Sequence, residues 1–169
     1  MSGAVVLAVE AGGHGQGSVT ALLVGLVLLV ANGFFVAAEI ALLAAKRARI
    51  EERAEQGDKA AARALEALRE LSVTFSGAQL GITMCSLGLG AVAEPAVAGY
   101  VEQALALTPL SAGARASVAF AIALSIVVFL HMVIGEMAPK NWALAGAEDV
   151  SLRLSRPFRA FVRLFRPLI

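Results

Sequence analysis

The chain has 169 residues, of which 59% are hydrophobic, and its mean hydropathy is +0.78. A soluble domain has an apolar share of about one half, so this composition favours a membrane protein. The formal net charge of +1 hides an uneven distribution, because charges are nearly absent from three long stretches. The single cysteine, Cys85, excludes a disulfide framework and a cluster of metal-bound thiolates.

Three apolar stretches are long enough to cross a membrane. The first runs from Val19 to Ala45, the second from Leu71 to about Val101, and the third from Ala116 to about Ala138. At ~1.5 Å per residue, each covers the ~30 Å hydrocarbon core. The second stretch is rich in small and hydroxylated residues and contains Pro95, so its helix either packs closely or is broken. The sequence therefore predicts an all-α membrane protein with three transmembrane helices.

The charged residues lie between and after these stretches. Residues 46–70 carry seven Lys or Arg and six acidic residues, with apolar side chains at mostly helical spacing and a break near Gly57. This pattern predicts a charged, water-facing helix or helical hairpin. Six basic residues follow the third span, and only Arg115 lies between the second and third spans. Since basic residues accumulate in cytoplasmic segments, we expect a plasma (inner) membrane protein with its N-terminus outside and its C-terminus in the cytosol.

The chain accordingly divides into three parts. We expect an uncleaved extracellular tail over residues 1–17, a three-span domain over residues 18–145, and an amphipathic juxtamembrane helix over residues 146–169. The last helix has a basic face and an apolar face, which predicts that it lies in the inner interface, with its arginines at anionic lipid phosphates and its phenylalanines in acyl chains. The alternative is packing against a following soluble domain. The arginines are Arg153, Arg156, Arg159, Arg163 and Arg166, and the phenylalanines are Phe158, Phe161 and Phe165.

Polar side chains inside the spans are the candidates for function, because each is costly in lipid. At ~1.5 Å per residue, Glu39 and Gln79 lie roughly 9–12 Å from the cytosolic ends of their spans, and Glu136 lies roughly 5 Å from its own. Asn32 and Thr83 lie near mid-membrane. All three spans therefore offer oxygen donors to one cavity on the cytosolic side.

These donors suit Mg²⁺, which prefers one or two carboxylates together with waters or neutral oxygens. Pro139 has no N–H, so it leaves the carbonyl near Gly135 without its helical partner and available to an ion or water. Two histidines and one cysteine do not suit a transition-metal site of the usual kind. The residues that fit this chemistry are Glu136, Glu39, Gln79, Thr83, Ser86, Asn32 and the backbone carbonyl near Gly135.

Each candidate also has a structural alternative. Glu136 could lie at the interface and reach water, and Glu39 could pair with Lys140. Asn32 could make a hydrogen bond between helices instead of binding an ion. His131 fits a structural hydrogen-bonding role better than proton transfer.

Three ordered motifs resemble the transmembrane domain of the CorC/CNNM family. They are NGFFVAAE at residues 32–39, QLGIT at 79–83 followed by LGLG at 87–90, and HMVIGEMAPK at 131–140, and the resemblance extends over residues 18–169. It implies a homodimer of three-span subunits with a cytosolic juxtamembrane belt. Such a protein binds Mg²⁺ in an inward-facing cavity and couples Mg²⁺ export to Na⁺ entry.

Carried over by motif position, the site draws on Asn32, the Val36 region, Gln79 to Thr83, Gly135 and Glu136. Several relatives place a serine where this chain has Val36, so only the Val36 backbone can contribute there. Family members usually continue into paired CBS domains that bind adenine nucleotide. Because this chain stops at Ile169, we expect a fragment in which ATP binding is absent together with those domains.

A membrane anchor or Mg²⁺-sensing regulatory dimer that does not transport is the main alternative, and a flux measurement discriminates between them. An enzyme is not expected, because the chain has no His-Glu-x-x-His or Gly-x-Ser-x-Gly motif and no convincing Ser/His pair. No nucleic-acid partner is expected either.

Overall fold

The structure is a computed structural model that describes the backbone of residues 2–168 and the side chains of residues 19–168. The tail predicted over residues 1–17 lies outside the residues with described side chains. Every regular element in the described part is helical, which confirms the all-α class. In chain order the elements are α1 (Ser2–Ala44), α2 (Arg47–Glu55), α3 (Lys59–Arg69), α4 (Leu71–Ala104), η1 (Leu105–Leu107), α5 (Ala112–Leu130), η2 (His131–Met137), α6 (Ala138–Ala145), α7 (Ala147–Phe165) and η3 (Arg166–Leu168).

Within the described residues, three helical stretches are long and apolar enough to cross a membrane: Val19–Ala44, Leu71–Leu107 and Ala112–Ala145. The second of them is not broken at Pro95, because α4 continues through that residue to Ala104. Proline removes one backbone donor, and the helix accommodates that loss without ending. The three predicted spans are therefore present as helices.

The chain forms two compact units, and α1 and α4 each run from one unit into the other. The first unit contains the chain up to Leu28 together with Leu87–His131. In it, a Cβ added to Gly25 would lie 3.0 Å from the Cβ of Ala93, so glycine permits this close approach of α1 to α4. Arg115 near the start of α5 lies 3.8 Å from a carboxylate oxygen of Glu102.

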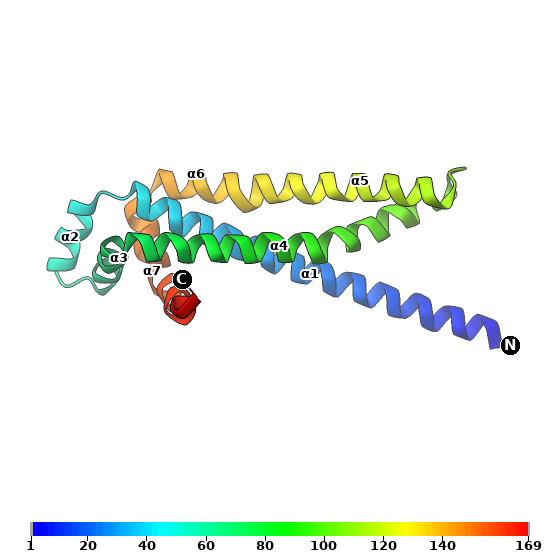
Figure 1. Cartoon of the computed structure of the whole chain (residues 1–169), viewed down its shortest axis with the longest axis horizontal. Helices are drawn as coiled ribbons and strands as arrows, with labels where there is room; N and C mark the ends of the chain where they lie inside the picture. The colour runs from blue at the N-terminus through cyan, green and yellow to red at the C-terminus, as the bar shows by residue number, and fades with distance from the viewer. Residues whose placement is uncertain (1, 169) are drawn as a thin grey trace. The chain divides into compact units, whose positions relative to one another are not determined.

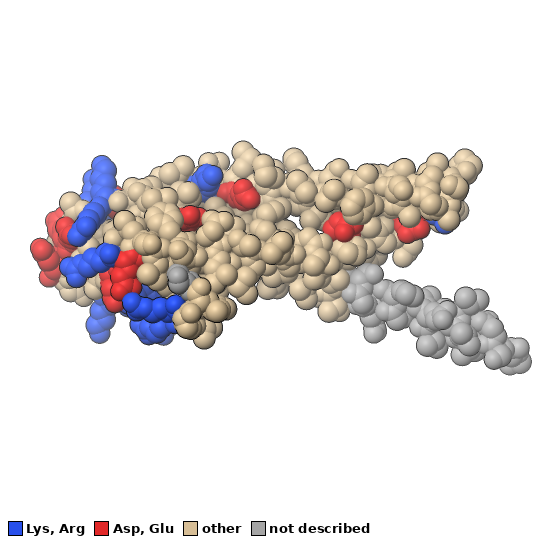
Figure 2. Space-filling view, viewed as in Figure 1, with Lys and Arg blue, Asp and Glu red and all other residues tan. Residues whose placement is uncertain are grey.

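The second unit contains Leu29–Ser86 and Met132–Ile169, and it holds the charged helices. The predicted charged segment forms α2 and α3, and the turn between them is at Gly57, whose φ of +91° is readily adopted only by glycine. Asp58 then caps α3 by accepting a 2.7 Å hydrogen bond from the backbone N–H of Ala60. α3 packs beside α7, and charged side chains gather over these helices (Figures 1 and 2).

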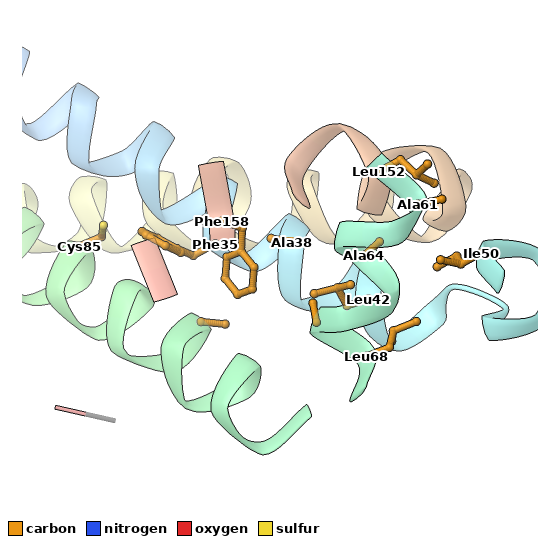
Figure 3. Packing of buried hydrophobic residues seen from close by; sticks show 12 residues of the cluster. Phe35, Ala38, Leu42, Ile50, Ala61, Ala64, Leu68, Cys85, Leu152 and Phe158 are labelled. Atoms are coloured by element: carbon orange, nitrogen blue, oxygen red, sulfur yellow. The ribbon is translucent and has the colours of Figure 1, made fainter. Parts of the chain in front are cut away.

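The core of the second unit is built around the apolar face of α7 (Figure 3). Phe158 is only 1% exposed, and its ring centroid lies 6.5 Å from that of Phe35 on α1. The ring of Phe161 lies closer to Phe35, at 4.5 Å. The expectation that these phenylalanines insert into acyl chains is therefore wrong for Phe158. An apolar helical face can be covered by lipid or by protein, and here α1 and α3 cover it.

Candidate functional site

The third span changes its helical geometry at the HMVIGEM sequence. α5 ends at Leu130, and His131–Met137 form a π-helical segment before α6 begins with Ala138 and Pro139. Wider helical turns of this kind occur mostly as short insertions and often at functional sites. Because Pro139 has no N–H, the carbonyl of Gly135 four residues earlier lacks the donor that a regular α-helix provides.

Asn32 on α1 supplies the missing donor. Its side-chain N–H donates a 2.9 Å hydrogen bond to the Gly135 carbonyl, although the two residues are 103 positions apart. The amide oxygen of Asn32 accepts a 3.3 Å hydrogen bond from the Ser86 hydroxyl on α4. Asn32 is 0% exposed, so both ends of a fully buried amide are satisfied. We call Asn32, Ser86 and Gly135 the asparagine node; it joins α1, α4 and the π-helical segment.

Close packing holds α1 and α4 together beside this node. A Cβ added to Gly81 would lie 2.7 Å from the ring carbons of Phe35, a distance that real Cβ atoms do not show. Glycine at position 81 therefore leaves the space that the Phe35 ring occupies. The same ring contacts Phe161, so this glycine also affects how α7 packs on the spans.

A second group of polar residues lines an open groove of about 590 Å³. Glu39 from α1 faces Ser76, Gln79 and Thr83 from α4 across it, and Leu168 at the end of the chain lies on its rim. On α4 these residues fall on one helical face together with Ser72, and all four α4 side chains are exposed. Sequence reasoning did not single out Ser76 as a site residue, although its helical spacing with Gln79 and Thr83 signals the shared face.

The predicted site residues therefore fall into two groups. Asn32, Ser86 and Gly135 meet in the asparagine node, while Glu39, Gln79 and Thr83 line the groove. Glu136 is half-buried and follows Gly135 in the π-helical segment, and it is not among the described residues that line the groove.

The structure also shows how far two other predicted site residues, Val36 and Glu39, are buried. Val36 is buried, so its side chain is enclosed by protein. Glu39 is half-buried, and its pairing with Lys140 stays a prediction.

The oxygen atoms of these two groups that could bind a metal ion are mainly uncharged. Among the described residues, His, Cys, Asp and Glu side chains form no group of three or more that could hold a metal ion. The oxygens brought together are instead an amide, hydroxyls and a backbone carbonyl, with Glu136 next in sequence to that carbonyl. Such a set, with the two carboxylates of Glu39 and Glu136, has the composition that Mg²⁺ accepts.

Comparison with known proteins covers most of the chain. A family model described as the cyclin M transmembrane N-terminal domain matches residues 23–169. An uncharacterized protein of Mycobacterium tuberculosis, Rv1841c, is 43% identical over 150 residues, which cover 89% of this chain and 42% of the relative. The UPF0053 protein YhdT of Bacillus subtilis is 37% identical over 148 residues, which cover 88% of this chain and 32% of the relative. The UPF0053 protein sll0260 of Synechocystis is 30% identical over 143 residues, which cover 85% of this chain and 32% of the relative. The chain thus spans less than half the length of these relatives.

Proposed function

Because the chain belongs to the cyclin M transmembrane-domain family, we propose that it is the membrane domain of a Mg²⁺ transporter that couples export of the ion to Na⁺ entry. The observation that carries this proposal is the hydrogen bond from Asn32 to the Gly135 carbonyl. It brings oxygen-bearing groups of separate spans together where Pro139 frees a backbone oxygen, and the carboxylate of Glu136 is the next side chain along.

The asparagine node accounts for how an ion could bind and leave. In the structure, the Asn32 N–H donates to the Gly135 carbonyl, and the Ser86 hydroxyl donates to the Asn32 oxygen. A Mg²⁺ ion takes the amide and carbonyl oxygens in exchange for these hydrogen bonds, while Glu136 supplies negative charge. When the ion takes these two oxygens, the Asn32 N–H and the Ser86 hydroxyl exchange their present acceptors for others, so binding requires a local rearrangement of the node. Val36 contributes at most its backbone.

The groove provides the approach to this node. The carboxylate of Glu39 attracts a cation, and the Ser76, Gln79 and Thr83 side chains offer oxygens in place of lost waters. Polar side chains exposed on a membrane-spanning helix are costly in lipid. We therefore propose that a second copy of the chain covers this face of α4, which makes the functional unit a homodimer. α2, α3 and α7 lie in the cytosol in this arrangement, at the inner face of the plasma membrane.

Flux measurements test the proposal. The 169-residue chain in proteoliposomes is expected to move Mg²⁺ faster with a Na⁺ gradient than without one. Glu136→Gln keeps size and removes charge, so it should weaken Mg²⁺ binding at least about tenfold, or ~1.4 kcal/mol. Glu94→Gln is the matched control, because it removes another half-buried carboxylate from a span. Glu94→Gln should bind Mg²⁺ like the wild type.

Calorimetric titration separates binding from transport. Wild-type Mg²⁺ affinity in Glu136→Gln, with dimer mass and helical content unchanged, contradicts the assigned role of that carboxylate. Mg²⁺ binding without flux under any gradient contradicts transport and favours the regulatory dimer.

A further inference from the structure

A separate pocket lies where α3, α4 and α7 meet, and the ion site does not use it. It has a volume of about 120 Å³. Its charged lining residues are Glu66 on α3, Glu70 directly after α3, Arg159 and Arg163 on α7, and Arg166 at the start of η3. Its remaining wall is largely apolar and includes Phe158 and Val162. The pocket thus combines opposite charges above an apolar floor.

The three arginines of the pocket are not equivalent. Arg159 forms an ion pair with Glu66, and Arg166 lies 3.4 Å from a carboxylate oxygen of Glu70. Arg163 is exposed and has no carboxylate partner among the described residues. Three arginines against two glutamates leave the pocket with one positive charge in excess, and Arg163 carries it.

The surroundings of the pocket indicate which kind of molecule would carry an anionic group bound there. α4, the second membrane span, begins at Leu71, directly after Glu70, so the pocket lies where charged sequence gives way to apolar sequence. Leu164, next to Arg163, is 72% exposed, and Leu168 one turn further is 76% exposed. Large apolar side chains exposed beside a basic side chain are typical of a segment at a membrane surface.

We propose that this pocket binds the phosphodiester headgroup of one anionic lipid, with Arg163 as the cation that contacts the phosphate and Leu164 and Leu168 against an acyl chain. A guanidinium can donate two parallel hydrogen bonds to phosphate oxygens. A monoanionic headgroup also matches the single excess charge. Arg159 and Arg166 hold α7 to the end of α3 and shape the pocket.

Native mass spectrometry of the purified chain with added lipid tests this proposal. We expect the wild type to retain one phosphatidylglycerol per chain and to retain phosphatidylcholine less. Arg163→Gln should lower phosphatidylglycerol affinity about fivefold, because one basic residue near an anionic lipid surface contributes ~1 kcal/mol. Arg156→Gln is the matched control, since Arg156 is exposed on the same side of α7, two turns away, and outside the pocket. Its affinity should stay within about twofold of the wild type.

The other outcomes overturn the proposal. An equal loss in Arg163→Gln and Arg156→Gln shows that lipid binding follows total charge and not this pocket. Glycerol 3-phosphate binding as tightly as the lipid assigns the pocket to a free phosphate compound. Equal retention of phosphatidylcholine and phosphatidylglycerol shows that the excess positive charge of the pocket does not select an anionic lipid. Helical content by circular dichroism should be unchanged in both variants, because both side chains are exposed. None of these results depends on Mg²⁺ flux.

Discussion

The side-chain amide of Asn32 donates a 2.9 Å hydrogen bond to the carbonyl of Gly135, the oxygen that Pro139 deprives of its helical donor. The buried amide and the freed carbonyl each require a hydrogen-bond partner, and each serves as the partner of the other. This one contact links the first span to the π-helical segment of the third. It therefore determines how the candidate ligands on the two spans are placed.

Removing this contact should destabilise the domain. Asn32→Ala leaves the Gly135 carbonyl buried without its donor, so we expect a loss of about 1–2 kcal/mol. Ser125→Ala is the control, because its hydroxyl only returns to the Ala121 carbonyl of its own helix at 2.8 Å. Thermal unfolding followed by circular dichroism in detergent should show a clear decrease for Asn32→Ala and little for Ser125→Ala. If Asn32→Ala and Ser125→Ala unfolded at the same temperature, the asparagine node would not stabilise the domain.

Adding one methyl group at Gly81 should disturb the packing of α4 on α1. The new Cβ would lie 2.7 Å from the Phe35 ring, and we expect Gly81→Ala to cost about 1–3 kcal/mol. Gly90→Ala is the matched control, since no described atom lies within 4 Å of its added Cβ. That substitution should be neutral or mildly stabilising, because alanine favours helix. Partial recovery in the Gly81→Ala, Phe35→Leu double variant would identify the clash as the cause.

Truncating Phe158 should detach α7 from the spans. This ring is 1% exposed, so Phe158→Ala is expected to cost about 3–5 kcal/mol. Hydrogen exchange should then accelerate across α7 before it does in α5. Phe129→Ala removes an equal ring that is 64% exposed, and it should leave the exchange of α7 unchanged. Unaltered exchange in Phe158→Ala would mean that lipid, not the core, covers this face.

The exposed polar face of α4 should meet its counterpart in a homodimer. In a Cys85→Ser background, Ser76→Cys is expected to form an intermolecular disulfide under mild oxidation in nanodiscs. Val30→Cys is the control, because it is 64% exposed on an apolar part of α1. It should cross-link little. A strictly monomeric mass in both detergent and nanodiscs would contradict the dimer.

The orientation of the chain can be tested by labelling from either side of the membrane. Gln56→Cys lies in the exposed turn between α2 and α3, and an impermeant maleimide should reach it only from the cytosolic side. Leu107→Cys, at the end of the second span and 98% exposed, should react from outside. Both variants carry Cys85→Ser. Labelling of Gln56→Cys from outside intact cells would reverse the proposed topology.

The sequence by itself determined the three spans, the charged segment and the break at Gly57, because hydropathy and glycine conformation are local properties. It also indicated that Pro139 frees a carbonyl, since a missing N–H affects only the residue one helical turn away. The tertiary structure decided which group meets that carbonyl, because Asn32 and Gly135 are 103 residues apart. It likewise decided what covers Phe158. A helical pattern shows that one face is apolar, but lipid and protein satisfy such a face equally well, and only the packing of α7 on α1 and α3 distinguishes them.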